Sequence, residues 1–251
     1  MADLSAFTPP SRRRMPEVPV PVLLAALAPV IVPQAVMARR FARVMPEPAG
    51  PRAGRAGEGR PLKVLVAGDS SAAGVGVAWQ DQALTGRLVR RLARRFDVSW
   101  RIEARSGLTT AGLVERLEGA RAEAFDAVVL GVGVNDVTRG VRRRDFLRRQ
   151  ARLRTLLRAR FGARRFYVTG LPPVGEFPLL PDPLRRVVGL QAARFDRALR
   201  GALAGEEDAR RVPFDTGLDP ALMAADGFHP GPAIYETWAE RMERAILRDF
   251  G

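Results

Sequence analysis

The sequence predicts an α/β protein, a three-layer α/β/α sandwich with a five-stranded, mostly parallel sheet. Short runs rich in β-branched and apolar residues alternate with longer stretches of helical periodicity. The alternation repeats five times, which is typical of successive βα units and therefore of a parallel sheet covered by helices. In addition, the chemically reactive residues come directly after strands, where open α/β sheets bind their ligands.

Each element follows from its own pattern. The strands are expected at Leu62–Ala67, Val98–Ala104, Ala127–Val132, Arg165–Thr169 and Arg211–Phe214. The helices are expected over about 80–95, 109–120, 141–161, 183–204 and 232–248. These elements lie in residues 62–251, which are enough for one domain with a sizeable core. Residues 46–61, rich in Gly, Pro, Ala and Arg, are typical of a linker, and residues 1–45 form an N-terminal tail.

The tail contains an apolar segment, residues 18–38, without a charged side chain. Its length is that of a membrane span, about 20 residues. However, four prolines lie inside it, and a proline in a helix interior costs about 3 kcal/mol. Three interpretations remain: a segment anchored at a membrane surface through its flanking arginines, a strap packed on the domain, or a cleaved export signal. The anchor is favoured and the export signal is the least favoured, so we expect a bacterial protein that is cytoplasmic or membrane-associated.

Composition excludes several classes of site. The net charge is +14, and Lys63 is the only lysine, so 40 of the 41 basic residues are arginine. The arginines alternate with Leu, Phe and Ala in helical stretches, which favours solvated helix faces over a nucleic-acid partner. The chain has no cysteine, one histidine and no EF-hand-like acidic set. We therefore expect no metal site and no cofactor.

Four short motifs follow the predicted strands. A Gly-Asp-Ser turn places Ser70 after the first strand, Gly107 follows the second, and Asn135 follows the third. Asp226 precedes the only histidine, His229, by three residues in a loop before the last helix. Taken singly, each motif is also compatible with a turn, a cap or a structural histidine. Together they supply a nucleophile, a base, an orienting carboxylate and amide donors at one edge of a sheet.

These motifs resemble those of the SGNH/GDSL hydrolase family, which has a flavodoxin-like fold. The matching residues are Gly68-Asp69-Ser70, Gly107, Gly133-Val134-Asn135-Asp136 and Asp226-Gly227-Phe228-His229, in the family's order. The resemblance covers about residues 62–248, and Ser71 replaces the leucine of the name-giving motif. It implies Ser70 as the nucleophile, His229 as general base and acid, and Asp226 as the partner of His229. It also implies an oxyanion hole made by the backbone amides of Ser70 and Gly107 and the side-chain amide of Asn135.

The substrate is less visible in the sequence. The proline-rich loop 171–183 follows the fourth strand and carries Phe177, Leu179 and Leu180, which are expected to bind an acyl chain if the loop borders the site. A surface loop packed on itself is the alternative. We expect a small-molecule or lipid-like ester as substrate. One rival function is deacetylation of a cell-envelope carbohydrate, and a more distant one is a basic module that binds membranes or nucleic acid without catalysis.

Overall fold

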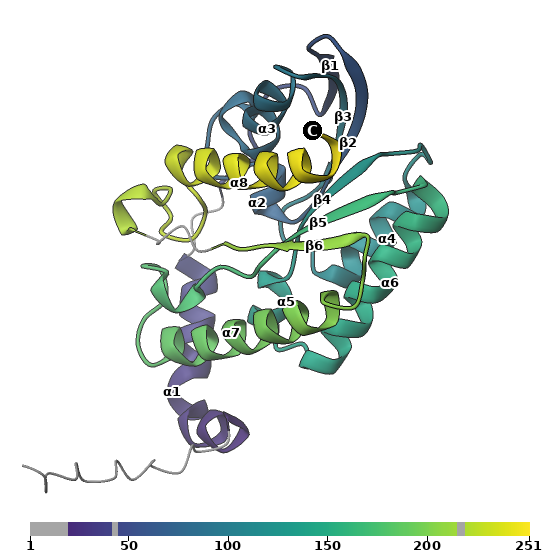
Figure 1. Cartoon of the computed structure of the whole chain (residues 1–251). Coiled ribbons are helices and arrows are strands. Elements are labelled where there is room, and N and C mark those ends of the chain that lie inside the picture. The colour runs from purple at the N-terminus through teal and green to yellow at the C-terminus, as the bar shows by residue number, and fades with distance from the viewer. Residues whose placement is uncertain (1–19, 42–44, 215–218) are drawn as a thin grey trace, which may run out of the picture.

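The computed structural model describes residues 20–41, 45–214 and 219–251. Its sheet is flanked by helices on both faces, which confirms the three-layer α/β/α fold (Figure 1). The strands are β1 (Ala53–Ala56), β2 (Arg60–Gly68), β3 (Phe96–Ala104), β4 (Ala127–Gly131), β5 (Arg165–Thr169) and β6 (Ala209–Val212). They lie in the order β1-β3-β2-β4-β5-β6.

The sheet has six strands rather than the predicted five. The additional strand, β1, lies within residues 46–61, where a linker was expected, and pairs antiparallel with β3. The composition misled because β1 is an edge strand with an exposed outer side, where small and charged residues are tolerated. Arg55 on β1 donates a hydrogen bond of 2.6 Å to Asp97, which helps to hold this edge. The other neighbouring strands pair in parallel, as predicted.

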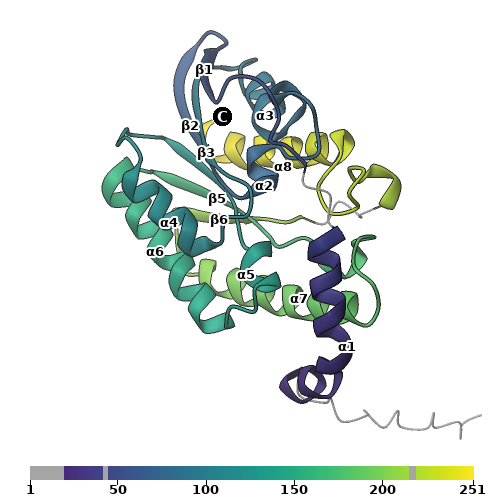
Figure 2. The ribbon, with the colours of Figure 1, turned by 180° about the vertical axis from the view of Figure 1, so that it is seen from behind.

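Two helical layers cover the sheet (Figures 1 and 2). One layer contains α2 (Ser70–Ala73), α3 (Leu84–Leu92) and α8 (Pro232–Phe250). The other contains α4 (Thr110–Gly119), α5 (Val134–Thr138), α6 (Arg143–Phe161) and α7 (Leu184–Leu203). The described residues also form three short 3₁₀ helices: η1 (Gln80–Gln82), η2 (Val174–Glu176) and η3 (Pro220–Leu222). Covered on both faces, the central strands β2 and β4 contain continuous apolar runs, and Val64–Val66 and Val128–Leu130 are fully buried.

Four of the five predicted helices form with ends within two residues of the prediction, as α4, α6, α7 and α8. The largest difference is in residues 80–95, where η1 and α3 replace a single helix and β3 begins at Phe96. Two short helices that begin directly after strands, α2 and α5, were not predicted. At four and five residues each, they are too short to show a helical period in the sequence.

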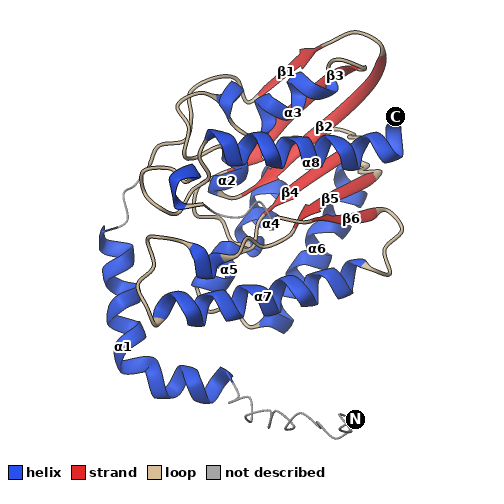
Figure 3. Ribbon diagram, turned by 60° about the vertical axis from the view of Figure 1, so that its left-hand side comes forward, coloured by secondary structure: helices blue, strands red, loops and turns tan. Residues whose placement is uncertain are grey.

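The apolar N-terminal segment forms helix α1 (Val20–Phe41), which lies beside α7 (Figure 3). Ile31 is buried, and Leu27, Ala35 and Ala38 pack against the domain. The helix bends in its first part, as expected with Pro29 and Pro33 in its interior. This packing has the geometry of the strap interpretation. Among the described residues no helix has the length and apolarity needed to cross a membrane, and residues 18 and 19 lie outside them.

Candidate active site

Ser70 lies at the start of α2, where the chain turns sharply out of β2. Gly68 makes this turn feasible, because a Cβ there would overlap the carbonyl oxygen of Gly131 on the adjacent strand β4. The Asp69 carboxylate caps α2 by accepting a hydrogen bond of 3.1 Å from the Ser71 backbone amide. The turn therefore fixes the Ser70 hydroxyl at the carboxyl end of the central strands.

His229 lies next to Ser70 although the two are far apart in the chain. Its Nε2 is 2.9 Å from the Ser70 Oγ, and its Nδ1 is 2.5 Å from Oδ2 of Asp226. With Nδ1–H donating to the carboxylate, Nε2 is free to accept the Ser70 proton. The structure thus brings Ser70, His229 and Asp226 together in one hydrogen-bonded chain.

The Asp226 carboxylate is held in its ionised form. Burial by itself would raise its pKa, but the His229 ring and the backbone amides of Phe228 and His229 donate hydrogen bonds to it. Their combined effect outweighs burial and lowers the pKa of Asp226 to about 2. A carboxylate so fixed can hold the imidazole in one tautomer and stabilise its protonated form.

Gly107 and Asn135 border the same groove as Ser70 and His229. Gly107 has a φ of +79°, a conformation that favours glycine, and its carbonyl accepts a hydrogen bond of 2.7 Å from Arg139. Asn135, near the start of α5, donates from Nδ2 to the Leu108 carbonyl at 3.0 Å. This bond uses one of the two amide hydrogens and fixes the side chain, so the second hydrogen remains for a ligand.

Two buried carboxyl groups support these positions. Burial raises the pKa of Asp69 to about 7, against the opposing hydrogen bonds from the Ser71 and Gly133 amides. Burial also raises the pKa of Asp136, which accepts hydrogen bonds from the backbone amide and the hydroxyl of Thr110 at 2.8 and 2.9 Å. Asp136 thus ties the loop that carries Gly107 to the helix that carries Asn135.

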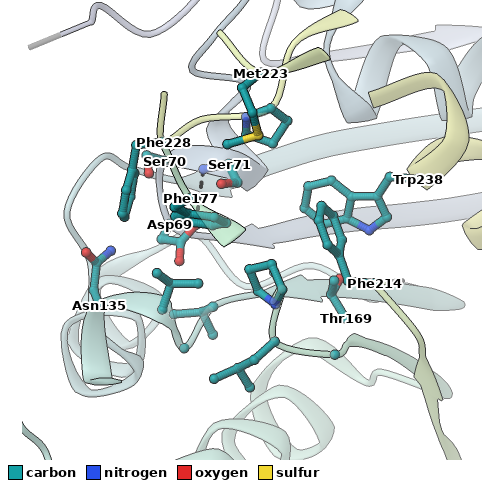
Figure 4. A pocket seen from close by; sticks show the side chains of 18 residues that line it. Asp69, Ser70, Ser71, Asn135, Thr169, Phe177, Phe214, Met223, Phe228 and Trp238 are labelled. Atoms are coloured by element: carbon teal, nitrogen blue, oxygen red, sulfur yellow. Dashed lines mark hydrogen bonds between the residues drawn. The ribbon is translucent and has the colours of Figure 1, made fainter. Parts of the chain in front are cut away.

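Two cavities meet at Ser70. The smaller has a volume of about 50 Å³ and is lined in part by Ser70. Figure 4 shows Ser70, Asn135 and Phe228 on one side of it and Thr169, Phe214 and Trp238 on the other. The larger is a mostly apolar groove of about 580 Å³ that also contains His229 and Asp226.

All three residues of loop 171–183 that the sequence marked as acyl-binding candidates lie at these cavities. Phe177 lines the smaller cavity, and Leu179 and Leu180 line the groove. The loop is therefore not packed only on itself. Among the described residues, no three His, Asp or Glu side chains are arranged to hold a metal ion.

Sequence reasoning missed other residues of the site. Phe228 packs edge-on against both Phe177 and His229, with ring centroids 5.0 and 5.2 Å apart, so it backs the imidazole. The position of Phe228 between Asp226 and His229 in the sequence could have indicated that it belongs to the site. Trp238 and Ala35 border the cavities from α8 and α1, and no local motif in the sequence marks either of them.

Comparison with known proteins identifies one family and several similar solved structures. A sequence profile of the GDSL-like Lipase/Acylhydrolase family matches residues 66–237. The chain is similar to the solved structure of TesA, with 28% identity and a TM-score of 0.57 over 73% of this chain and 97% of that one. No curated protein matches the chain.

Two further solved structures share the fold. The psychrotrophic esterase EstA from Pseudoalteromonas sp., inhibited by monoethylphosphonate, is 19% identical with a TM-score of 0.58 over 75% of this chain and 98% of that one. Axe2, an acetylxylan esterase from Geobacillus stearothermophilus, is 21% identical with a TM-score of 0.54 over 77% of this chain and 95% of that one.

Proposed function

Since the chain belongs to the GDSL-like lipase/acylhydrolase family, we propose that it hydrolyses carboxylic esters through an acyl-enzyme formed on Ser70. The observation that carries this proposal is the hydrogen-bonded chain from Ser70 through His229 to Asp226. A serine hydroxyl is a weak nucleophile by itself, and an adjacent base oriented by a carboxylate is what activates it.

The reaction proceeds in two halves. Ser70 Oγ attacks the ester carbonyl carbon while Nε2 of His229 takes the hydroxyl proton, which gives a tetrahedral intermediate. His229 then passes this proton to the departing alkoxide, so the C–O bond breaks and an alcohol leaves. In the second half a water molecule attacks the acyl-enzyme, with His229 again accepting and returning the proton, and the carboxylic acid is released.

The negative charge that develops on the carbonyl oxygen needs fixed donors. We assign this role to the backbone amides of Ser70 and Gly107 and to the side-chain amide of Asn135. The shared groove and the hydrogen bond that fixes Asn135 support the assignment. Donors held in place before the reaction stabilise the intermediate without reorganising.

The substrate class that fits best is an ester with an aliphatic acyl chain. The apolar walls of the groove, among them Leu179 and Leu180, support this choice. Deacetylation of a carbohydrate is the rival, and activity on p-nitrophenyl esters of increasing acyl length separates the two functions. A sharp preference for acetyl would favour the deacetylase.

Contact with a membrane surface is a further part of the proposal. Val30, Val32, Val36 and Met37 of α1 expose apolar side chains to solvent, and such a face can rest at a lipid interface. Co-sedimentation with vesicles of zwitterionic and of anionic lipid tests it. The exposed face predicts binding to both, whereas arginine-driven binding alone would need anionic lipid and fall with salt.

The catalytic proposal is tested with a fluorophosphonate, which reacts covalently with activated serines. We expect one modified peptide that contains Ser70, and no labelling of a Ser70→Ala variant. Ser71 is the internal control, because it is the neighbouring hydroxyl. Labelling that persists in Ser70→Ala, together with its undiminished ester hydrolysis, would refute the mechanism and leave the non-catalytic binding module as the better explanation.

A further inference from the structure

The apolar groove extends from Ser70 to a wall outside the matched family region. His229 and Phe228 border it together with Ser70, and Ala35 and Ala38 of α1 also line it. Residues 66–237 match the family, so α1 lies outside that match. The N-terminal helix is thus structurally part of the groove that opens at the serine.

Helix α1 is attached at this place by specific contacts. The Gln34 side chain donates to the carbonyl of Asp182 at 2.7 Å and accepts from the backbone amide of Leu184 at 3.1 Å. It thereby joins α1 to the start of α7, where Leu184 and Val188 form the adjoining wall of the groove. Buried Ile31, one turn earlier, adds apolar packing.

The groove has the character of a site for an aliphatic chain. Alanine, leucine and valine side chains make up much of its mostly apolar lining, and its volume of about 580 Å³ is within the range for small-molecule sites. The two alanines of α1 are small, and they leave the space that a larger side chain would fill. The acyl group is the part of an ester that stays bonded to Ser70 after the alcohol has left, so it gains most from a continuous apolar surface.

We propose that α1 is a wall of the substrate site, and that Ala35 and Ala38 determine the length of acyl chain that the groove accepts. This inference rests on the proposed function, because it takes Ser70 as the acylated residue. It assigns to the N-terminal helix a specificity-determining role in addition to any contact with a membrane.

The test compares Ala35→Phe with Val36→Phe in the full chain. The two positions are neighbours on α1, but Ala35 lines the groove while Val36 is 60% exposed and points away from it. We measure kcat/KM for the p-nitrophenyl esters of acetate, butyrate and octanoate. Ala35→Phe should lower the octanoate value at least about tenfold and leave acetate within about twofold, because overfilling an apolar pocket excludes added methylenes. Val36→Phe should keep the wild-type profile.

Gln34→Ala is the second variant, chosen because it adds no bulk. Loss of both hydrogen bonds should loosen the attachment of α1 and raise KM for p-nitrophenyl octanoate. The kcat for p-nitrophenyl acetate should be unchanged. A thermal melt of each variant establishes that it is folded.

The outcomes separate the two proposals. If the wild-type protein neither hydrolyses p-nitrophenyl acetate nor reacts with fluorophosphonate, the proposed function is refuted, and this inference with it. An active protein in which Ala35→Phe and Val36→Phe give the same chain-length profile would overturn the role of α1 alone. Selective loss of octanoate in Ala35→Phe supports it.

Discussion

The imidazole Nε2 of His229 lies 2.9 Å from the hydroxyl oxygen of Ser70, across 159 positions of the sequence. Each partner is fixed by its own local structure: Ser70 by the turn between β2 and α2, and His229 by the loop before α8. In that loop Gly227, with a φ of +63°, allows the Asp226 carboxylate to fold back onto the His229 ring. The reactive pair therefore depends on two local structures that only the sheet brings together.

Replacing Asp226 by asparagine should lower kcat by about 10³–10⁴ with little change in KM, because the amide favours the wrong imidazole tautomer. Steady-state kinetics at neutral pH measures this. Asp81→Asn, at an exposed site, is the matched control and should be indistinguishable from wild type. Activity of Asp226→Asn within a few-fold of wild type would mean that the carboxylate is only structural.

The lowered pKa of Asp226 predicts the pH range in which its protonation destabilises the fold. A folded-state pKa of about 2, below the usual value of 3.8, means that the Asp226 contribution to stability is present above about pH 4. It is lost as the pH falls through about 2. Acid unfolding of wild type and Asp226→Asn should therefore converge at the lowest pH, and a constant difference down to pH 2 would contradict this assignment.

Asn135→Ala should reduce kcat by about 10²–10³, the usual effect of losing one oxyanion donor. The hydrogen bond to Leu108 O is lost as well, which costs about 1 kcal/mol of stability. Kinetics combined with a urea titration distinguishes the two effects. Unchanged kcat alongside reduced stability would show that Asn135 serves the loop and not the reaction.

Asp69→Asn should make stability less dependent on pH. The pKa of Asp69 is raised to about 7, so its contribution is fullest below about pH 4 and is lost as the pH rises through 7. Asparagine keeps an oxygen that can accept from the Ser71 amide but carries no charge. Relative to wild type, the variant should gain on the order of 1 kcal/mol or more between pH 5 and pH 8, since one pKa unit corresponds to about 1.4 kcal/mol. Urea unfolding at the two pH values measures this difference. If the free energy of unfolding changes equally with pH in both proteins, Asp69 is not neutral in the fold at low pH.

Gly68→Ala should destabilise the fold by about 1–3 kcal/mol and reduce activity, because the added methyl group forces β2 away from Gly131 and moves Ser70. Gly119→Ala is the control, since a Cβ there meets no atom within 4 Å at the end of α4. The control should be neutral or slightly stabilising. Equal melting temperatures for the two variants would mean that the turn tolerates the shift.

The sequence predicts a strand or helix correctly where its local pattern of apolar residues matches the burial of those residues in the fold. The central strands are buried on both faces, so their apolar runs stand out, as in Val128–Leu130. Edge strand β1 could not be found in this way, because its residues Ala53–Ala56 are mostly exposed and become a strand only by pairing with β3. Helix α2 could not be predicted either, because its four residues form a single turn that depends on the end of β2 directly before it.

The candidate site also contains residues that the sequence identifies and properties that only the folded structure shows. Ser70, Gly107, Asn135, Asp226 and His229 could be named from the sequence, because each belongs to a short motif with recognisable turn chemistry. Asp69 lies inside such a motif, yet its raised pKa comes from burial, which no motif encodes. Phe228 could be placed beside His229 along the chain, but not against Phe177.

By itself the sequence determined the order of the central strands and the long helices and identified the candidate reactive groups, since both depend on residues close together in the chain. Tertiary structure decided the distances between those groups, the burial that shifts the pKa of Asp69, and the place of α1 at the groove. The physical reason is that hydrogen-bond lengths, desolvation and cavity walls arise between segments distant in sequence. Ala35 and Leu180 therefore become walls of one groove only when the chain is folded.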